Sequence, residues 1–331
     1  MSPVVLVCLP SPHDVWRLSP DHEASLRSDF PDAEFRIVDS GAVADQLKDV
    51  HVYLGRRFAA EWFPLAPHLE WIASPAAGTD HLPVAEAEAA GVALTRSYGF
   101  HGRPMAEHAM GLVLGFSRGL FVSSRLQRTD LVWRDRLAEE FFDLADATMT
   151  IVGCGSIGSH LASAARAFGM NVIGVRRTPP PDTIEGITWM GADQARRAIA
   201  RGDVVVNLLP ATDDTRGYFS AEFFTAFKPG AMFLNLGRAA TVDHSALLHT
   251  LESGRLLGAA LDVTDPQPLP LDHPLRHHPR VVLTPKSSTL SRGYMDGAVA
   301  FFADNLHRYL SGWPLKGLVT APATRHRREG G

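Results

Sequence analysis

The chain alternates between short apolar runs and longer stretches in which apolar residues recur with helical spacing. Runs of this kind predict buried strands, and the stretches between them predict covering helices. In the first part of the chain the runs are Val4–Leu9, Phe35–Val38, Val50–Leu54, Trp71–Ala73 and Val92–Thr95. This part is expected to form a small parallel sheet with helices on its faces.

A second series of apolar runs follows: Met149–Val152, Asn171–Val175, Val204–Leu209, Met232–Leu236, Leu257–Val263 and Val281–Thr284. The segments between them predict helices at Asp193–Ala200, Ser220–Phe227 and Asp243–Ser253. Six strands that alternate with helices are typical of a doubly wound sheet. Two long helical patterns, Met105–Leu126 and Leu290–Leu310, flank this series.

Three glycines directly follow the strand predicted at Met149–Val152. Gly153, Gly155 and Gly158 form a G-x-G-x-x-G motif, with Ser156 and Ile157 inside it, and a helix and a second strand come next. Strand, glycine turn, helix and strand within about 30 residues is the context that a dinucleotide-binding motif requires. The pyrophosphate is expected to lie on the free N–H groups at the start of the helix.

The predicted fold is therefore α/β, with a Rossmann-type nucleotide-binding domain inserted into a smaller, flavodoxin-like domain. We expect the nucleotide-binding domain at residues 103–290. The smaller domain, which would bind the substrate, is expected at residues 1–102 and 291–331. The two long helical patterns are expected to connect them.

The end of the second nucleotide-domain strand indicates which cofactor binds. NAD sites usually have an Asp or Glu there, which accepts hydrogen bonds from the ribose hydroxyls. This chain has Arg176, Arg177 and Thr178 instead. Two guanidiniums suit a 2′-phosphate in charge and in bidentate geometry, so NADP(H) is preferred and NAD(H) remains possible. Arginines that are merely solvated are the alternative interpretation.

Composition narrows the function classes. With 331 residues, 45% hydrophobic residues and a net charge of −4, the chain has the composition of an ordinary soluble protein, without the basic excess of nucleic-acid-binding proteins. It contains neither an apolar run that could cross a bilayer nor a signal-like start, which favours the cytoplasm. Two cysteines and fifteen histidines show no disulfide framework and no metal-ligand spacing.

Further motifs resemble the D-isomer-specific 2-hydroxyacid dehydrogenases, nearer to the glyoxylate/hydroxypyruvate reductase type. They are SPAAGTDHL (Ser74–Leu82), MAEHAMGLVLGFSRG (Met105–Gly119), IVGCGSIG (Ile151–Gly158), DVVVNLLPATDDTRGYF (Asp203–Phe219), KPGAMFLNLGRAATVD (Lys228–Asp243), GAALDV (Gly258–Val263) and DHPLRHHPRVVLTP (Asp272–Pro285). The resemblance implies an NAD(P)-dependent oxidoreductase acting on 2-hydroxy acids. It also implies a homodimer built on the nucleotide-binding domain, with a small-molecule substrate held between the domains.

On the cofactor side, the resemblance assigns Asp262 to the nicotinamide carboxamide. Leu236 and Gly237 would pass beside the nicotinamide ribose, and Pro210 and Thr215 would border the adenosine. These roles follow from matching positions in the motifs.

On the substrate side, the resemblance places the substrate-binding arginine at Arg238, whose guanidinium would bind the carboxylate and polarise the carbonyl. The N–H groups of the Ala76–Ala77–Gly78 turn would hold the carboxylate. Arg56 lies where relatives sometimes contact a substrate charge, and a solvated loop arginine is the alternative.

The loop Arg96–Pro104 is aromatic and basic. Tyr98, Phe100, His101 and Arg103 are candidates for a pocket that takes a bulkier or acidic substrate. His101 is either a substitute acid or a solvent-exposed loop histidine. His108, in the AEHAM segment, is expected to be a packed helix residue.

The sequence departs from the family at the proton donor. The family has a His in a T-P-H turn, oriented by a Glu, whereas this chain has Lys286 after Thr284 and Pro285, and Gln267 at the acidic position. Burial and the nearby Arg238 would lower the pKa of a lysine, and neutral Gln267 would leave its charge uncompensated. We therefore predict that Lys286 donates the proton and that Gln267 orients it or the substrate.

Two alternatives remain open for this substitution. The first is a substrate other than a simple 2-oxo acid: a bulky or strongly anionic electrophile, or an imine that is already protonated and needs no acid. A second possibility is a corepressor-like or sensor-like protein that binds dinucleotide and has lost turnover. The retained Arg238 and Asp262 favour catalysis.

Overall fold

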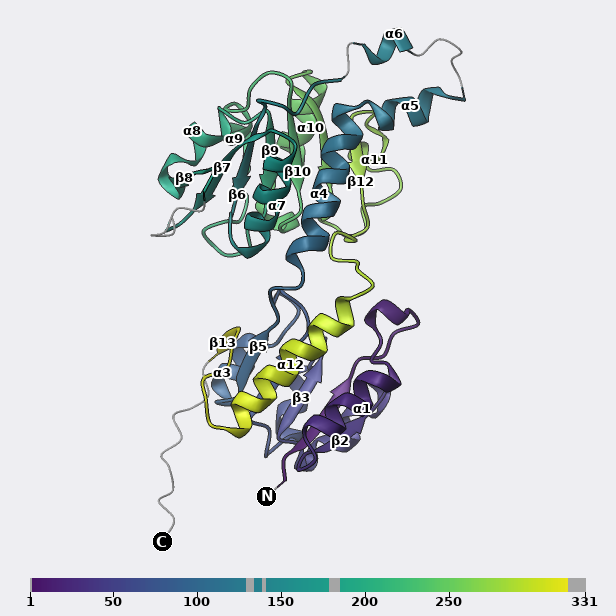
Figure 1. Ribbon diagram of the computed structural model, residues 1–331, viewed down its shortest axis with the longest axis vertical. Helices are drawn as coiled ribbons and strands as arrows, with labels where there is room; N and C mark the ends of the chain where they lie inside the picture. The colour runs from purple at the N-terminus through teal and green to yellow at the C-terminus, as the bar shows by residue number, and fades with distance from the viewer. Residues whose placement is uncertain (1, 129–133, 139–140, 179–184, 321–331) are drawn as a thin grey trace. The chain divides into compact units, whose positions relative to one another are not determined.

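The computed structural model describes residues 2–128, 134–138, 141–178 and 185–320. The chain forms two compact units, one made of Met1–Phe100 with Leu290–Gly331 and the other of His101–Thr289 (Figure 1). The second unit is thus inserted into the first along the sequence.

The first unit contains a six-stranded sheet in the order β13-β5-β4-β3-β1-β2. Its strands are β1 (Val4–Cys8), β2 (Glu34–Ile37), β3 (Val52–Gly55), β4 (Trp71–Ser74), β5 (Ala93–Arg96) and β13 (Leu318–Thr320). Strands β1 to β5 are parallel and have the flavodoxin-like order 2-1-3-4-5. The antiparallel edge strand β13 was not predicted, because its three residues give no apolar run.

Helices cover both faces of this sheet. The helices are α1 (Pro20–Asp29), α2 (Val43–Gln46), α3 (Val84–Ala89) and α12 (Tyr294–Leu310), and short 3₁₀ helices lie at Asp14–Trp16, Ser40–Ala42, Leu47–Asp49 and Ala60–Leu65. Residues of α1 and α12 share one core cluster with the sheet. Residues of α2 and α3 share the cluster on the opposite face. The Trp71 ring stacks on Phe302 of α12 at 5.3 Å between centroids.

The second unit contains a seven-stranded parallel sheet in the order β12-β11-β10-β9-β6-β7-β8. Its strands are β6 (Thr148–Val152), β7 (Asn171–Arg176), β8 (Ile187–Gly191), β9 (Val204–Asn207), β10 (Ala231–Asn235), β11 (Leu256–Leu261) and β12 (Val281–Leu283). The predicted doubly wound fold is confirmed. The prediction of six strands is wrong, because β8 mixes buried and exposed residues and therefore lacks a continuous apolar run.

The helices of the second unit are α4 (Gly102–Ser117), α5 (Leu120–Leu126), α6 (Arg134–Leu137), α7 (Ser156–Ala167), α8 (Ala195–Ile199), α9 (Ala221–Phe224), α10 (His244–Glu252) and α11 (Pro274–His277), with 3₁₀ turns at Ala192–Gln194 and Ala239–Thr241. Helices α4 and α7 pack on one face of the sheet and α9 and α10 on the other. The single helix predicted for Met105–Leu126 is wrong: Gly119 adopts a left-handed φ of 62° and separates α4 from α5.

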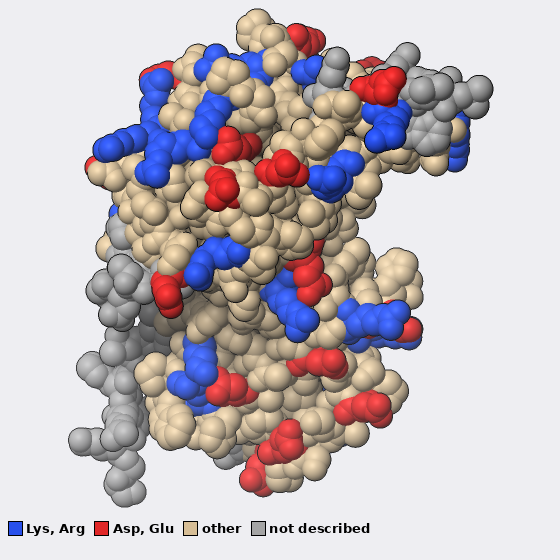
Figure 2. Space-filling view, turned by 45° about the horizontal axis from the view of Figure 1, so that its top comes forward, with Lys and Arg blue, Asp and Glu red and all other residues tan. Residues whose placement is uncertain are grey.

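Acidic and basic side chains both occur across the face drawn in Figure 2. Within the described ranges, none of the helices combines the length and the apolar character needed to cross a bilayer.

Candidate active site

The glycine turn between β6 and α7 has little room for side chains. Gly153 has a φ of 86°, and a Cβ atom there would lie 2.9 Å from the carbonyl carbon of Leu208. A Cβ at Gly158 would lie 2.9 Å from the Cys154 sulfur. Gly155 instead faces open space. The first and third glycines are therefore required by packing, and the second leaves the backbone open to a ligand.

The start of α7 is suited to an anion. Its N-cap is Gly155, which supplies no side-chain cap. The first-turn N–H groups, including those of Ser156 and Ile157, have no acceptor within the helix. Together with the helix dipole they favour a pyrophosphate, so the residues present fit a dinucleotide.

The residues after β7 are accessible. Arg176, Arg177 and Thr178 are all exposed. No Asp or Glu occupies this strand end in the sequence. The position therefore presents positive charge and a hydroxyl to the surroundings.

Two buried asparagines, which sequence reasoning missed, shape the loops after β9 and β10. Asn207 Nδ2 donates to Asn235 Oδ1 at 2.9 Å and to Thr241 Oγ1 at 2.7 Å. Asn207 Oδ1 accepts the N–H of Leu209, and Asn235 Oδ1 accepts the N–H of Gly237. Each asparagine is the polar last residue of an apolar strand, which is the signal that could have identified it.

The predicted cofactor residues of these loops lie next to this network, which bonds the backbone of Leu209 and Gly237. Thr215 Oγ1 donates to the carbonyl of Pro210 at 2.6 Å, so these two residues lie together. Leu236 is buried, with 3% of its surface exposed. A Cβ at Gly237 would lie 2.6 Å from the Leu209 carbonyl oxygen, so a larger residue does not fit.

Arg238 lies three residues after the end of β10 and is half-buried. Its Nη1 donates to the carbonyl of Gly237 at 3.0 Å, which fixes the side chain near its own strand end. Thr241 Oγ1 donates to the Arg238 carbonyl at 2.6 Å and holds the backbone.

Asp262 follows β11 and is buried, with 1% of its surface exposed. Its carboxylate accepts hydrogen bonds from Thr284 Oγ1, Ser287 N and Ser288 N at 2.6, 2.8 and 3.1 Å. An ionised carboxylate has about four acceptor positions, so one remains for a ligand. Asp262 thus supports the turn after β12, a contact that the sequence did not indicate.

Lys286 lies in this turn and is exposed. The burial that we expected for Lys286 is therefore wrong. Its backbone N–H donates to the carbonyl of Asp262 at 2.9 Å, so the turn is fixed to the end of β11 while the side chain is at the surface. Gln267 is also exposed, between Pro266 and Pro268. Its loop is fastened by His244, whose Nδ1 donates to the Asp265 carbonyl at 3.3 Å. Burial lowers the pKa of His244.

His108 was expected to be a packed helix residue, but it makes polar contacts. Its Nε2 lies 3.2 Å from Thr284 Oγ1 and 3.7 Å from Asp262 Oδ1. These contacts connect α4 with the turn that carries Lys286.

In the first unit, Arg56 directly follows β3. Its guanidinium lies 5.1 Å from the Trp16 ring centroid and 5.7 Å from that of Tyr294. Its Nη2 is buried and has no hydrogen-bond partner among the described residues. Burial lowers the pKa of Arg56. Arg56 is thus a partly desolvated cation between two aromatic rings rather than a solvated loop residue.

The turn after β4 lies beside it in the sheet, since Leu54 of β3 pairs with Ala73 of β4. The N–H of Ala76 donates to Ser74 Oγ at 3.2 Å, so this predicted donor already has a partner. The carbonyl of Ala77 accepts from Arg96 at 3.3 Å. Ala76, Ala77 and Gly78 are all half-buried.

The aromatic and basic loop is only partly as expected. The Tyr98 ring packs edge-on against Phe301 at 5.0 Å, and the Phe100 ring packs against Tyr294 at 5.4 Å. His101 is buried, with 3% exposed, so the interpretation as a solvent-exposed loop histidine is wrong. Arg103 forms an ion pair with Glu107 one helical turn away and is 85% exposed.

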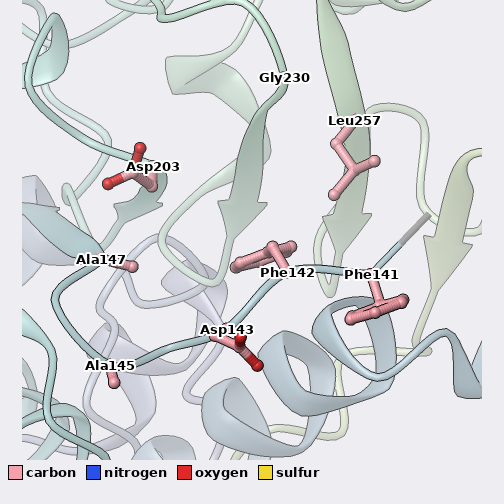
Figure 3. Close-up of a pocket in the computed structure, with 8 residues that line it drawn as sticks. All are labelled: Phe141, Phe142, Asp143, Ala145, Ala147, Asp203, Gly230 and Leu257. Atoms are coloured by element: carbon pink, nitrogen blue, oxygen red, sulfur yellow. The ribbon is translucent and has the colours of Figure 1, made fainter. Parts of the chain in front are cut away.

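A cavity of about 390 Å³ lies elsewhere in the second unit. Its lining includes Phe141, Phe142 and Leu257, with Asp143 and Asp203 (Figure 3). Asp203 directly precedes β9, so the cavity lies at the amino ends of the strands. The glycine turn, Arg238 and Asp262 follow carboxyl ends, the edge where ligands bind in such sheets, so this cavity is not the candidate active site.

Comparisons with known proteins agree with this arrangement. The family model for the NAD binding domain of D-isomer specific 2-hydroxyacid dehydrogenases matches residues 110–288. Glyoxylate reductase from Thermococcus onnurineus is 28% identical over 342 residues, covering 100% of this chain and 99% of that protein. Formate dehydrogenase from Arabidopsis thaliana is 29% identical over 306 residues, covering 90% of this chain and 77% of that protein.

A solved structure extends the similarity to the fold. NADPH-dependent glyoxylate/hydroxypyruvate reductase from Sinorhizobium meliloti, in complex with NADP and sulfate, has a TM-score of 0.79 at 29% identity, covering 96% of this chain and 98% of that chain. The matched family model spans more than half of the sequence. The chain therefore belongs to the D-isomer specific 2-hydroxyacid dehydrogenases, a family of NAD(P)-dependent oxidoreductases.

Proposed function

We propose that this enzyme reduces a 2-oxo acid or a related electrophile with NADPH, and that Lys286 donates the proton. The observation that carries the proposal is the position of three residues at one edge of the sheet. Arg238, Asp262 and Lys286 follow β10, β11 and β12, which are neighbouring parallel strands. Strand ends of this kind meet at the ligand-binding edge of a doubly wound sheet.

Each residue has a distinct part in the proposed reaction. The Arg238 guanidinium binds the substrate carboxylate with two parallel hydrogen bonds and draws electron density from the carbonyl oxygen. Bound NADPH supplies the hydride when present. The Lys286 Nζ donates a proton to the same oxygen as charge develops there. Gln267 is neutral and so does not compensate the ammonium, and it orients Lys286 or the substrate by hydrogen bonding.

The preference for NADPH rests on the exposed Arg176, Arg177 and Thr178. The Sinorhizobium meliloti relative is described as NADPH-dependent, with NADP bound. We expect kcat/KM to be at least about tenfold higher with NADPH than with NADH, since charge-assisted hydrogen bonds contribute roughly 1.5–3 kcal/mol. Replacing Arg176 and Arg177 with Gln should remove this difference and leave the NADH reaction intact. Equal kcat/KM with both cofactors in the unaltered enzyme contradicts the preference.

Within the first unit, we propose that the loops after β3 and β4 carry groups that bind an anionic substrate. The N–H groups of Ala77 and Gly78, and Ala76 if it exchanges its Ser74 partner, would hold the carboxylate. Arg56 would contact a further negative charge. Tyr98, which is 41% exposed, would line the side-chain end, which fits a bulky or acidic substrate. His101 belongs to the second unit and is 3% exposed, so it is not proposed as a substrate contact.

We also propose a homodimer through the nucleotide-binding unit. Leu120 and Phe141 are 57% and 47% exposed, and the Arg118 guanidinium, two residues before Leu120, lies 5.5 Å from the Phe141 ring centroid, so both apolar side chains belong to one region of the surface. Phe141→Glu should convert the dimer to a monomer in sedimentation equilibrium. Phe168→Glu is the matched control, because Phe168 is 46% exposed in the same unit and should leave the mass unchanged. A monomeric parent enzyme excludes the proposal.

A dinucleotide-binding protein without turnover is the second candidate. It is favoured by the replacement of both members of the family's acid pair by exposed residues, Lys286 and Gln267. Turnover separates the two candidates. NADPH oxidation should be followed with glyoxylate, hydroxypyruvate and longer 2-oxo acids, each with and without methylamine to form the imine. A rate only with methylamine identifies imine reduction, and tight NADPH binding without any rate supports the sensor.

The proton donor is tested by variants at Lys286. Lys286→Met should lower kcat by roughly 10²–10⁴, the usual contribution of a positioned acid. Lys286→Arg keeps the charge but is a far weaker acid, so it should lose nearly as much. A loss below about threefold in Lys286→Met, with unchanged NADPH affinity, refutes the role.

A further inference from the structure

The turn that carries Lys286 is held largely by one buried carboxylate. Asp262 Oδ1 accepts from Thr284 Oγ1 and Ser287 N, and Oδ2 accepts from Ser288 N. The Asp262 carbonyl accepts the N–H of Lys286. Hydrogen bonds on both sides of Lys286 therefore end on a single residue.

This support is needed because of the backbone at Lys286. Its φ is 54°, in the left-handed region that residues with a Cβ rarely adopt. A residue persists in that region only when its surroundings determine it. The direction in which the ammonium leaves the sheet thus depends on the bonds to Asp262.

His108 adds a contact from another element. The Thr284 hydroxyl donates its proton to Asp262 at 2.6 Å, so toward His108 it can only accept. His108 Nε2, 3.2 Å from Thr284 Oγ1, must therefore carry a proton and donate it. A chain of hydrogen bonds thus runs from α4 through Thr284 to the carboxylate of Asp262.

We propose that His108 and Thr284 are positioning residues that hold the Lys286 turn in its reactive geometry. The proposal rests on the proposed role of Lys286 as proton donor. In this arrangement neither residue touches the reacting atoms; they act through Asp262 and the turn. A displacement of about 1 Å in a reacting group can cost roughly 10²-fold in rate, so the effect on kcat is measurable.

The test pairs a disruptive with a conservative variant at each position. Thr284→Val removes the hydroxyl at nearly constant shape and should lower kcat about tenfold, because two hydrogen bonds are lost. His108→Leu loses one hydrogen bond and should lower kcat about threefold. KM for the 2-oxo acid should change less than twofold. Thr284→Ser and His108→Gln, which retain the hydroxyl and an N–H donor, should restore most of kcat. Equal losses in the Val and Ser variants overturn the proposal.

A double variant shows whether these residues act through Lys286. Lys286→Met with Thr284→Val should be no slower than Lys286→Met alone, whereas independent effects would multiply. Multiplying losses overturn the proposal. If Lys286→Met itself retains kcat, the proposed role of Lys286 as proton donor is refuted, and this result is distinct from a failure of the positioning role of His108 and Thr284.

Amide hydrogen exchange tests the hydrogen bonds from His108 through Thr284 to Asp262 without requiring turnover. In the ligand-free protein, Thr284→Val and His108→Leu should speed exchange of the Ser287 and Ser288 amides, and the Ser and Gln variants should not. Unchanged exchange in both disruptive variants also overturns the proposal.

Discussion

The carboxyl edges of the two sheets are built differently. In the seven-stranded sheet, Asn207 and Asn235 end β9 and β10, and Asp262 follows β11. All three are at most 1% exposed, and their side chains hydrogen-bond to the loops at this edge of the sheet. In the six-stranded sheet, the corresponding position after β3 is Arg56, whose buried Nη2 lacks a hydrogen-bond partner among the described residues. The first edge holds these three side chains by hydrogen bonds to neighbouring loops, and the second leaves a cation that lies against two aromatic rings of its own unit.

This difference suggests a division of tasks. Polar groups that are fully bonded before a ligand arrives stay in place during a reaction, which favours groups that act on the reacting atoms. A cation that lacks a carboxylate partner gains most when an anionic ligand arrives, which favours selection of substrates. Substitutions at the first edge should therefore change kcat, and those at the second edge should change substrate preference.

The largest expected effect lies at Arg238. Arg238→Met should lower kcat/KM by about 10³, because it removes two proposed hydrogen bonds to the substrate carboxylate, and a hydrogen bond to a charged group contributes roughly 1.5–3 kcal/mol. Arg238→Lys keeps the charge without the planar fork and should recover only part of this loss. Steady-state kinetics with a 2-oxo acid gives the values, and NADPH affinity by fluorescence titration is the control. A loss below about tenfold in Arg238→Met would remove Arg238 from the substrate site.

The next largest effect is on the free energy of unfolding, and substitutions at the two sheet edges should lower it by different amounts. Asn235→Ala leaves the Gly237 N–H without its acceptor and takes one acceptor from Asn207, which should cost about 2–3 kcal/mol. Ser74→Ala in the other unit removes a single bond to the Ala76 N–H and should cost about 1 kcal/mol. Urea unfolding with hydrogen exchange read separately for peptides of each unit gives both values. Equal costs would show that the two edges do not differ in this way.

How much of these two sheet edges could be predicted from the sequence depends on how far apart the interacting residues lie along the chain. The glycine turn was predictable because strand, Gly153 and helix are consecutive. The contact of Asn207 with Asn235 spans 28 residues, and that of His108 with Thr284 spans 176. Apolar periodicity predicts strands but not their order or register, so it does not show which polar residues meet. The exposure of Lys286 was missed for the same reason: the chain position of a turn does not reveal its depth.

Substrate selection at Arg56 should show a smaller and more specific change. Arg56→Met keeps an apolar stem between Trp16 and Tyr294 and removes the charge. We expect kcat/KM to fall about tenfold for 2-oxo acids with a second carboxylate, since a hydrogen bond to a charged group contributes roughly 1.5–3 kcal/mol. Glyoxylate, which has only one carboxylate, should be reduced at nearly the original rate, and Arg56→Lys should keep part of the preference. Parallel losses for both substrates would contradict selection by charge.

The smallest effect is a pH dependence of stability at the loop that carries Gln267. Burial lowers the pKa of His244 in the folded chain and outweighs the opposing hydrogen bond to the Asp265 carbonyl; His273 lowers the pKa further, and the Asp265 and Asp243 charges raise it slightly. The unfolded chain takes up this proton near its ordinary pKa of about 6.5, whereas the folded chain does not, so the contribution is fully present above that pH and is lost as pH falls below it. One proton changes the free energy of unfolding by at most about 1.4 kcal/mol per pH unit. His244→Asn retains an N–H donor for the Asp265 carbonyl and cannot titrate, so urea midpoints between pH 7.5 and 5 should fall less steeply for the variant. Parallel curves would mean that His244 takes up its proton equally well in both states, and that its burial does not support the Gln267 loop.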